Sequence, residues 1–192
     1  MQRPVLRDHV AAGILDAAAP VLAERGDAVS MASIAEAAGV GRATLYRYFP
    51  NREALVAGMV ERALDDLGAR IADARVDSVP VPEGIARLVR AFLAEGRKYA
   101  AVVQLKPVRE QKARMSPGGG EERVSGPLRA LVARGVADGT LRSDVPEDVQ
   151  FEMFTALVER ALGLVLAGRL GAEEAGAVVG SAFLEGFRGA RE

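Results

Sequence analysis

The chain has no cysteine and no tryptophan, and its single histidine, His9, lies near the N-terminus. Without cysteine there is no disulfide, no thiolate nucleophile and no cysteine-bound metal. A lone histidine also argues against a two-histidine metal site and against a Ser-His-Asp triad set in a deep cleft. The sequence therefore predicts no metal site, no cofactor and no catalytic residues.

An excess of one charge and a long hydrophobic run are missing as well. Lys plus Arg total 25 and Asp plus Glu total 26, so binding of nucleic acid has to come from a local basic patch rather than from bulk charge. The longest uncharged stretch, residues 175–184, is half of the ~20 residues that span a bilayer. The N-terminal segment lacks the apolar core of a secretion signal, so we expect a cytoplasmic protein without a membrane partner.

Aromatic residues make up 5% of the 192 residues, and alternating β-branched runs are scarce, whereas helical periodicity recurs. The pattern predicts an all-α protein of one domain or two small ones. We expect Pro20 to kink or split the first helix, and a second break at Pro107, after which residues 106–114 either continue a helix or form another. Residues 76–82 are predicted as a loop, and residues 115–127 as a flexible connection. The predicted helices are residues 7–25, 31–38, 42–49, 51–74, 83–105, 128–137, 146–167 and 173–187.

Residues 30–52 read SMASIAEAAGVGRATLYRYFPNR, with two short helices on either side of Gly39. Ser30 can cap the first helix, and Gly39 can adopt the left-handed conformation of a tight turn. Ala35 is small enough to let the second helix cross closely. Leu45 and Phe49 are four residues apart, so they face inward together. These features predict a helix-turn-helix.

The opposite face of the second helix has nucleic-acid chemistry, since residues 40–52 contain three arginines and no acidic residue. Arginine can bind guanine bidentately, and Thr or Tyr hydroxyls can hold phosphates. The start of the next helix offers free backbone N–H groups for a further phosphate. The alternatives are a solvated helix face for the arginines and half-buried packing for the two tyrosines. The predicted DNA-binding residues are Ser30, Arg42, Thr44, Tyr46, Arg47, Tyr48, Asn51 and Arg52.

The stretch resembles the DNA-binding domain of the TetR/AcrR family of transcriptional regulators, over about residues 14–55. Its most specific part is GVGRATLYRYFPNREAL, preceded by SMASIAEAA. Gly41 and Ala43 depart from the family, which often has Ser and Gly there. The resemblance implies an N-terminal three-helix helix-turn-helix domain, residues 1–52, and a C-terminal helical domain, residues 53–192, for ligand binding and dimerisation.

The same resemblance implies an unidentified small-molecule effector in the C-terminal half. The candidate pocket residues are Phe92, Tyr99, Arg109, Met115, Phe151 and Phe154, with core packing as the alternative for the apolar ones. Arg109 belongs to a basic cluster that is either a solvated face or a contact for an anionic effector. The last two helices carry apolar and small residues typical of a dimer interface, although biased composition also explains the small ones. The interface candidates are Leu157, Ala161, Leu162, Val165, Gly176, Gly180 and Phe183.

The function predicted from the sequence is a ligand-responsive transcriptional regulator. The resemblance implies a homodimeric repressor that a small molecule releases from a palindromic double-stranded DNA operator. One alternative is a helical ligand-binding dimer without DNA binding, which would have no reason to keep the basic surface of residues 42–52. The other alternative, a small α-helical enzyme, lacks cysteine, an interior histidine and a Gly-rich phosphate loop.

Overall fold

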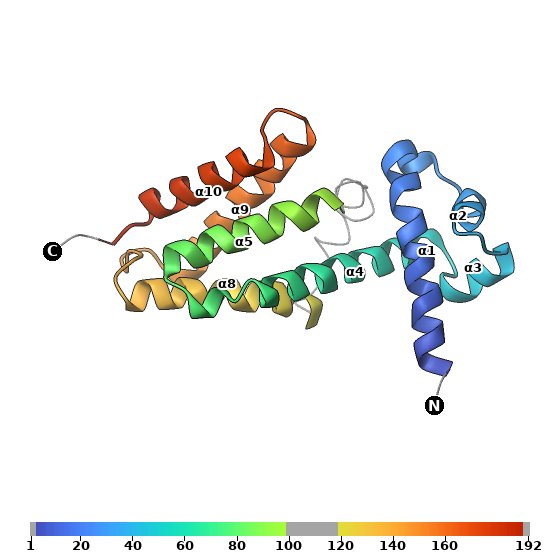
Figure 1. Cartoon of the computed structure of the whole chain (residues 1–192), viewed down its shortest axis with the longest axis horizontal. Coiled ribbons are helices and arrows are strands. Elements are labelled where there is room, and N and C mark those ends of the chain that lie inside the picture. The colour runs from blue at the N-terminus through green and yellow to red at the C-terminus, as the bar shows by residue number, and fades with distance from the viewer. Residues whose placement is uncertain (1–2, 99–118, 190–192) are drawn as a thin grey trace. The chain divides into compact units, whose positions relative to one another are not determined.

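The computed structural model describes residues 3–98 and 119–189, and within these ranges the chain is helical (Figure 1). Across these residues there is no β-strand, apart from one isolated bridge between Leu141 and Arg188. The all-α prediction is confirmed. The elements are α1 (Arg3–Arg25), a 3-10 turn (Gly26–Ala28), α2 (Met31–Ala37), α3 (Arg42–Tyr48), α4 (Arg52–Asp73), a second 3-10 turn (Val76–Ser78), α5 (Val81–Lys98), α8 (Gly119–Ala137), α9 (Glu147–Leu166) and α10 (Ala172–Gly186).

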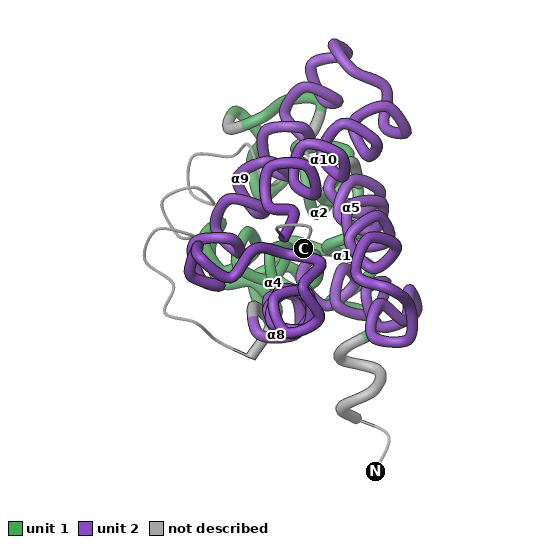
Figure 2. Tube along the Cα trace, turned by 90° about the vertical axis from the view of Figure 1, so that its left-hand side faces the viewer, with its two compact units in different colours: residues 1–63, 99–116 green, residues 64–98, 117–192 purple. Residues whose placement is uncertain are grey.

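The described residues fall into two compact units, each with its own hydrophobic core (Figure 2). Unit 1 comprises the described residues up to 63, and unit 2 comprises residues 64–98 and 119–189. The division lies inside α4, which contributes Leu55 and Met59 to the first core and Ile71 to the second. A domain boundary after residue 52 stays a prediction.

Unit 1 is built from α1, α2, α3 and the beginning of α4. Ala18 and Leu22 of α1 are buried on either side of Pro20, which is itself exposed. Their burial offsets the hydrogen bond that proline cannot donate, and α1 continues through Pro20 as one helix. The buried core of this unit consists of Ile14, Ala18, Leu22, Val29, Ile34, Ala35, Leu45, Phe49, Leu55, Val56 and Met59.

Unit 2 is organised around α5, which packs against α8, α9 and α10. The largest buried side chains include Phe154 of α9 and Phe183 of α10, whose rings meet edge to face with centroids 5.1 Å apart. Such a pair adds about 0.5–1.5 kcal/mol to the stabilisation from its buried area. Two aromatic residues of the C-terminal half are therefore committed to joining the last two helices.

The helix α8 begins earlier than the sequence indicated. Residues 119–127 belong to it, so the prediction of a flexible connection was wrong for these residues. Val124, Leu128 and Leu131 are buried at helical spacing, and this apolar stripe outweighs the helix-breaking tendency of Pro127. Residues 106–114 and the expected break at Pro107 lie outside the described residues.

Candidate functional site

The turn between α2 and α3 sets the geometry of the predicted DNA-reading element. The hydroxyl of Ser30 accepts a hydrogen bond from the Ser33 N–H at 3.1 Å, so the predicted cap of α2 is confirmed. At the other end, Gly39 has a φ of 65°. Its N–H donates to Glu36 O at 3.0 Å, and the Val40 N–H donates to Ala35 O at 3.0 Å. This pair of bonds is the Schellman motif, which ends a helix and redirects the chain within two residues.

The orientation of α3 follows from its two inward residues. Leu45 is 0% exposed and Phe49, directly after the helix, is 7% exposed. Both belong to the core of unit 1, where Ala35 of α2 leaves room for a close crossing of the two helices. Because these residues face the core, the opposite side of α3 faces solvent. That side carries Arg42, Ala43, Tyr46 and Arg47, all exposed.

The exposed side of α3, which we call the α3 face, combines charge, hydroxyl and aromatic surface. Tyr46 is 48% exposed, an unusual position for a large aromatic side chain in a small unit. The Arg47 guanidinium lies 5.3 Å from the centroid of the Tyr48 ring, which is half-buried against the core. Thr44 is half-buried beside them. The face can therefore donate hydrogen bonds to base edges and to phosphates.

Asn51 and Arg52, two other predicted DNA-binding residues, have contacts inside unit 1. The Asn51 side-chain oxygen accepts a hydrogen bond from the Ala54 N–H at 2.7 Å, as expected for the cap of α4. Arg52 donates from Nη1 to Val29 O at 2.5 Å and from Nη2 to Gly26 O at 3.3 Å. Arg52 thus fastens the start of α4 to the segment that precedes α2. Contacts of these two residues with DNA stay predictions.

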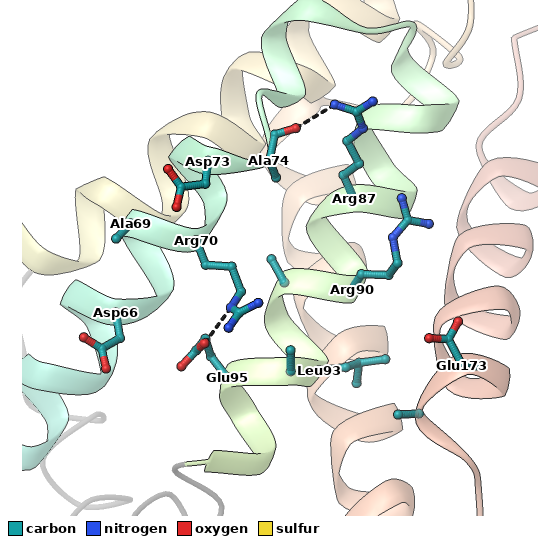
Figure 3. Close-up of a pocket in the computed structure, with 13 residues that line it drawn as sticks. Asp66, Ala69, Arg70, Asp73, Ala74, Arg87, Arg90, Leu93, Glu95 and Glu173 are labelled. Atoms are coloured by element: carbon teal, nitrogen blue, oxygen red, sulfur yellow. Dashed lines mark hydrogen bonds and ion pairs between the residues drawn. The ribbon is translucent and has the colours of Figure 1, made fainter. Parts of the chain in front are cut away.

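Unit 2 contains a cleft of about 880 Å³ between α4, α5 and the first turn of α10 (Figure 3). Arg70 of α4 donates from Nε to Glu95 Oε1 of α5 at 2.5 Å. Arg87 donates to Ala74 O at 2.8 Å and to Glu83, a residue outside the lining, at 3.0 Å. The hydrogen bond from Arg87, together with the charge of Arg90, holds the pKa of the Glu83 carboxyl below its usual value. The cleft is therefore lined by charged and small apolar side chains, and the Arg70–Glu95 ion pair joins two of its lining residues.

Of the predicted pocket residues that the structure describes, none lines this cleft. Phe154 is fully buried in the core of unit 2, and Phe92 and Phe151 pack against that core, which is the alternative role that the sequence left open. Arg129 lies over the Phe151 ring, 3.9 Å from its centroid. The other three candidates, Tyr99, Arg109 and Met115, lie outside the described residues.

Glu95 is a residue of the cleft lining that was not predicted from the sequence. It lies three residues after Phe92, so it continues the apolar stripe of α5 toward the core. An acidic residue at such a position is a signal that could have been used, because charged side chains are seldom buried without a partner.

The predicted dimer residues lie on the inward faces of α9 and α10. Phe183, Ala161 and Gly180 are buried by the helices of their own unit, where plain packing accounts for them. Leu157, Leu162 and Val165 are half-buried against the same core, and Gly176 is half-buried near Leu93. The large apolar residues exposed on these two helices are Val149, Met153 and Val178. A dimer interface through the candidate residues stays a prediction.

The turn at Gly39, the inward Leu45 and the exposed α3 face together form a helix-turn-helix element. Residues 14–59 match the family described as bacterial regulatory proteins, tetR family. The match covers the helix-turn-helix and the beginning of α4, and over these residues the chain is similar to the TetR family.

A curated relative, the HTH-type transcriptional repressor LfrR of Mycolicibacterium smegmatis, is 39% identical over 90 residues, which are 47% of each chain. An uncharacterized HTH-type transcriptional regulator of Mycobacterium tuberculosis is 51% identical over 59 residues, 30% of this chain and 29% of that one. The chain thus spans about half the length, or less, of these curated relatives.

Solved structures extend the similarity of fold to nearly the whole chain. A TetR-family regulator from Rhodococcus sp. superposes with a TM-score of 0.77 at 19% identity, covering 93% of this chain and 98% of that one. LfrR of Mycobacterium smegmatis in complex with proflavine superposes with a TM-score of 0.74 at 24% identity, covering 96% and 99%. Within the described ranges, no helix combines the length and the apolar character that a membrane crossing requires.

The left-handed turn at Gly39 generates a prediction about stability. We expect Gly39→Ala to lower the free energy of unfolding of unit 1 by about 1–2 kcal/mol, because a Cβ strains the backbone at positive φ. Nothing lies within 4 Å of that Cβ, so the loss reports backbone strain rather than a clash. Urea unfolding followed by circular dichroism measures the change. The matched control is Gly41→Ser, where φ is −67° at the cap of α3 and a small gain of a few tenths of a kcal/mol is expected. Equal losses in both variants would contradict the geometry of the turn.

The bonds of Arg52 generate a second prediction. Arg52→Ala should destabilise unit 1 by about 1.5–3 kcal/mol, since two backbone carbonyls lose a charged donor. Arg42→Ala, at an exposed position on the α3 face, should change stability by less than about 0.5 kcal/mol. The same urea titration compares the two. A loss of similar size in Arg42→Ala would show that Arg52 has no special role in holding the fold.

Proposed function

We propose that the chain is a ligand-responsive transcriptional regulator that binds double-stranded DNA as a homodimer and acts as a repressor. The observation that carries this proposal is the α3 face: Arg42, Ala43, Tyr46 and Arg47 are exposed together, on a short helix held from behind by Leu45 and Phe49. A surface helix with cationic and hydroxyl groups fits the major groove of B-DNA.

The arginines and the tyrosine of this region differ in chemistry and in contacts, so we assign them different roles in DNA binding. Arg42 and Arg47 can bind guanine or phosphate, and Tyr46 offers a hydroxyl and an apolar ring edge to phosphates or thymine methyl groups. Arg52 is engaged with backbone carbonyls, so we assign it to positioning the element. The net charge of −1 makes this local patch the source of the electrostatic attraction.

A homodimer would give the two α3 faces the two-fold relation that a palindromic operator needs. Met153 of α9 is 49% exposed and Val178 of α10 is 51% exposed. Val149 and Ala156 lie on the same outward side of α9 as Met153, at spacings of four and three residues. We propose that these outward sides of α9 and α10 form part of the interface between the two copies.

Release by an effector is the third part of the proposal. The similarity to the transcriptional repressor LfrR, which was solved in complex with proflavine, supports a regulator that responds to a small molecule. A ligand shifts the DNA-bound state only through its difference in affinity for the bound and free conformations. The competing interpretation is a ligand-binding dimer that does not bind DNA. The match to a family of regulatory proteins favours the DNA-binding regulator.

Binding to the DNA upstream of the protein's own coding region tests the proposal. We expect salt-dependent binding in a fluorescence titration, and we expect Arg42→Ala and Arg47→Ala each to weaken it by about tenfold or more. A variant that loses a phosphate contact should also lower the slope of log affinity against log salt concentration by about one. Arg169→Ala, an exposed arginine of unit 2, is the matched control and should bind as the wild type does.

Two results would count against this function. No binding by the wild type at low salt, even to a library of DNA sequences, would favour the ligand-binding dimer. Equal weakening by Arg169→Ala would mean that bulk charge rather than the α3 face binds DNA. Transcription from the same promoter in vitro, with and without the protein, separates repression from activation.

The proposed interface makes a separate prediction. Val178→Asp should raise the dissociation constant of the dimer by about tenfold or more, because a charge would be buried without a partner. Sedimentation velocity over a range of concentrations measures it. Ala130→Asp, at an exposed position of α8, serves as the control and should leave the dimer intact. A dimer of unchanged affinity in Val178→Asp would place the interface elsewhere.

A further inference from the structure

Glu95 is a buried acid with half of its hydrogen-bonding capacity unused. Its side chain is 9% exposed, and it lies among the residues that line the cleft of unit 2 (Figure 3). Oε1 accepts a hydrogen bond from Arg70, whereas Oε2 is buried and has no hydrogen-bond partner. A buried carboxylate oxygen without a donor is costly, because the water it had in the unfolded chain is not replaced. Glu95 is one of the residues that line the cleft, so a donor bound there would lie next to this carboxylate.

The arginines of the cleft are already engaged. Arg70 is bound to Glu95, Arg87 donates to Ala74 O and Glu83, and Arg90 pairs with Glu83 at 3.3 Å. Glu83, which does not line the cleft, pairs with both Arg87 and Arg90 and partly offsets their positive charge. An incoming anion would have to compete for these bonds, whereas a cation would leave them in place.

Acidic side chains also line the cleft on the α4 side, across from Glu95 of α5. Asp66 and Asp73 of α4 also line it, and their seven-residue spacing places them on one face of the helix. In the described part of the chain, no ion pair joins Asp73 to an arginine. Ala69 lies between the two acids, and Ala91 and Ala94 contribute short apolar side chains from α5. Alanines of α4 and α5 thus form an apolar strip in the cleft, and carboxylates lie beside it.

We propose that this cleft binds an aliphatic diamine. One ammonium group donates to Oε2 of Glu95 and supplies the missing partner. The methylene chain lies on the alanines between α4 and α5, and the second ammonium group is held by Asp73. That the diamine acts as the effector rests on the function proposed above, whereas its binding to the cleft does not.

Isothermal titration calorimetry of the full chain with cadaverine, without DNA and at constant ionic strength, tests the proposal. We expect Glu95→Gln to raise the dissociation constant about 10- to 100-fold, the loss expected for a hydrogen bond to a charged group. Gln keeps the oxygen that Arg70 binds. Asp73→Asn, at an exposed position, should weaken binding without disturbing the fold. Glu174→Gln, an acid of α10 outside the cleft lining, is the matched control and should bind as the wild type does.

Two further probes make the result decisive. Pentanol, which has no ammonium group, and adipate, a dicarboxylate, should not bind. Binding of adipate in place of cadaverine, no binding of cadaverine, or equal weakening in Glu174→Gln would overturn the proposal.

A DNA titration with cadaverine, comparing the wild type with Glu95→Gln, tests the effector role separately. Release of the wild type alone supports it, and equal behaviour of the two proteins would show that the diamine binds without acting as the effector. A protein that binds cadaverine in the calorimeter but never binds DNA would refute the proposed function and leave the cleft assignment standing.

Discussion

The close packing of α3 against α2, in the core that contains Leu45 and the small Ala35, is the contact on which the helix-turn-helix depends. A helix of seven residues is too short to be stable by itself in water, so α3 exists because its inward residues are buried. The left-handed turn at Gly39 brings the two helices together at short range. Once Leu45 and Phe49 are fixed in the core, the positions of Arg42, Tyr46 and Arg47 are fixed as well.

Charge is distributed locally rather than globally in this protein. The chain as a whole is nearly neutral, yet residues 40–52 hold three arginines without an acid. The structure divides their roles, since Arg52 donates to Val29 O and Gly26 O while Arg42 and Arg47 are exposed. Arginine side chains therefore both hold the helix-turn-helix in place and give its exposed surface a positive charge.

Unit 2 follows a different design, in which aromatic side chains make the core and ionic side chains line the cleft. Phe154 and Phe183 join α9 to α10, so they are not available as walls of an open pocket. Arg70, Arg87 and Glu95 occupy the space between α4 and α5 instead. Buried ionic groups contribute little to stability unless every atom is paired, so the unpaired Oε2 of Glu95 is better explained by binding than by folding.

The sequence by itself determined the helical class, the helix-turn-helix and the caps at Ser30 and Asn51, because each of these depends on residues a few positions apart. Only the tertiary structure decided what each apolar stripe packs against. Periodicity marks a face to be buried but does not name the partner, so the inward stripe of α9 suggested an interface between copies, although its residues pack in the core of their own unit. Likewise, Pro127 lies inside α8 because distant core residues bury the stripe around it, and Arg52 and Glu95 obtained their partners from segments 23 to 26 residues away. Long-range burial and long-range hydrogen bonds are properties of the folded chain, and no local pattern encodes them.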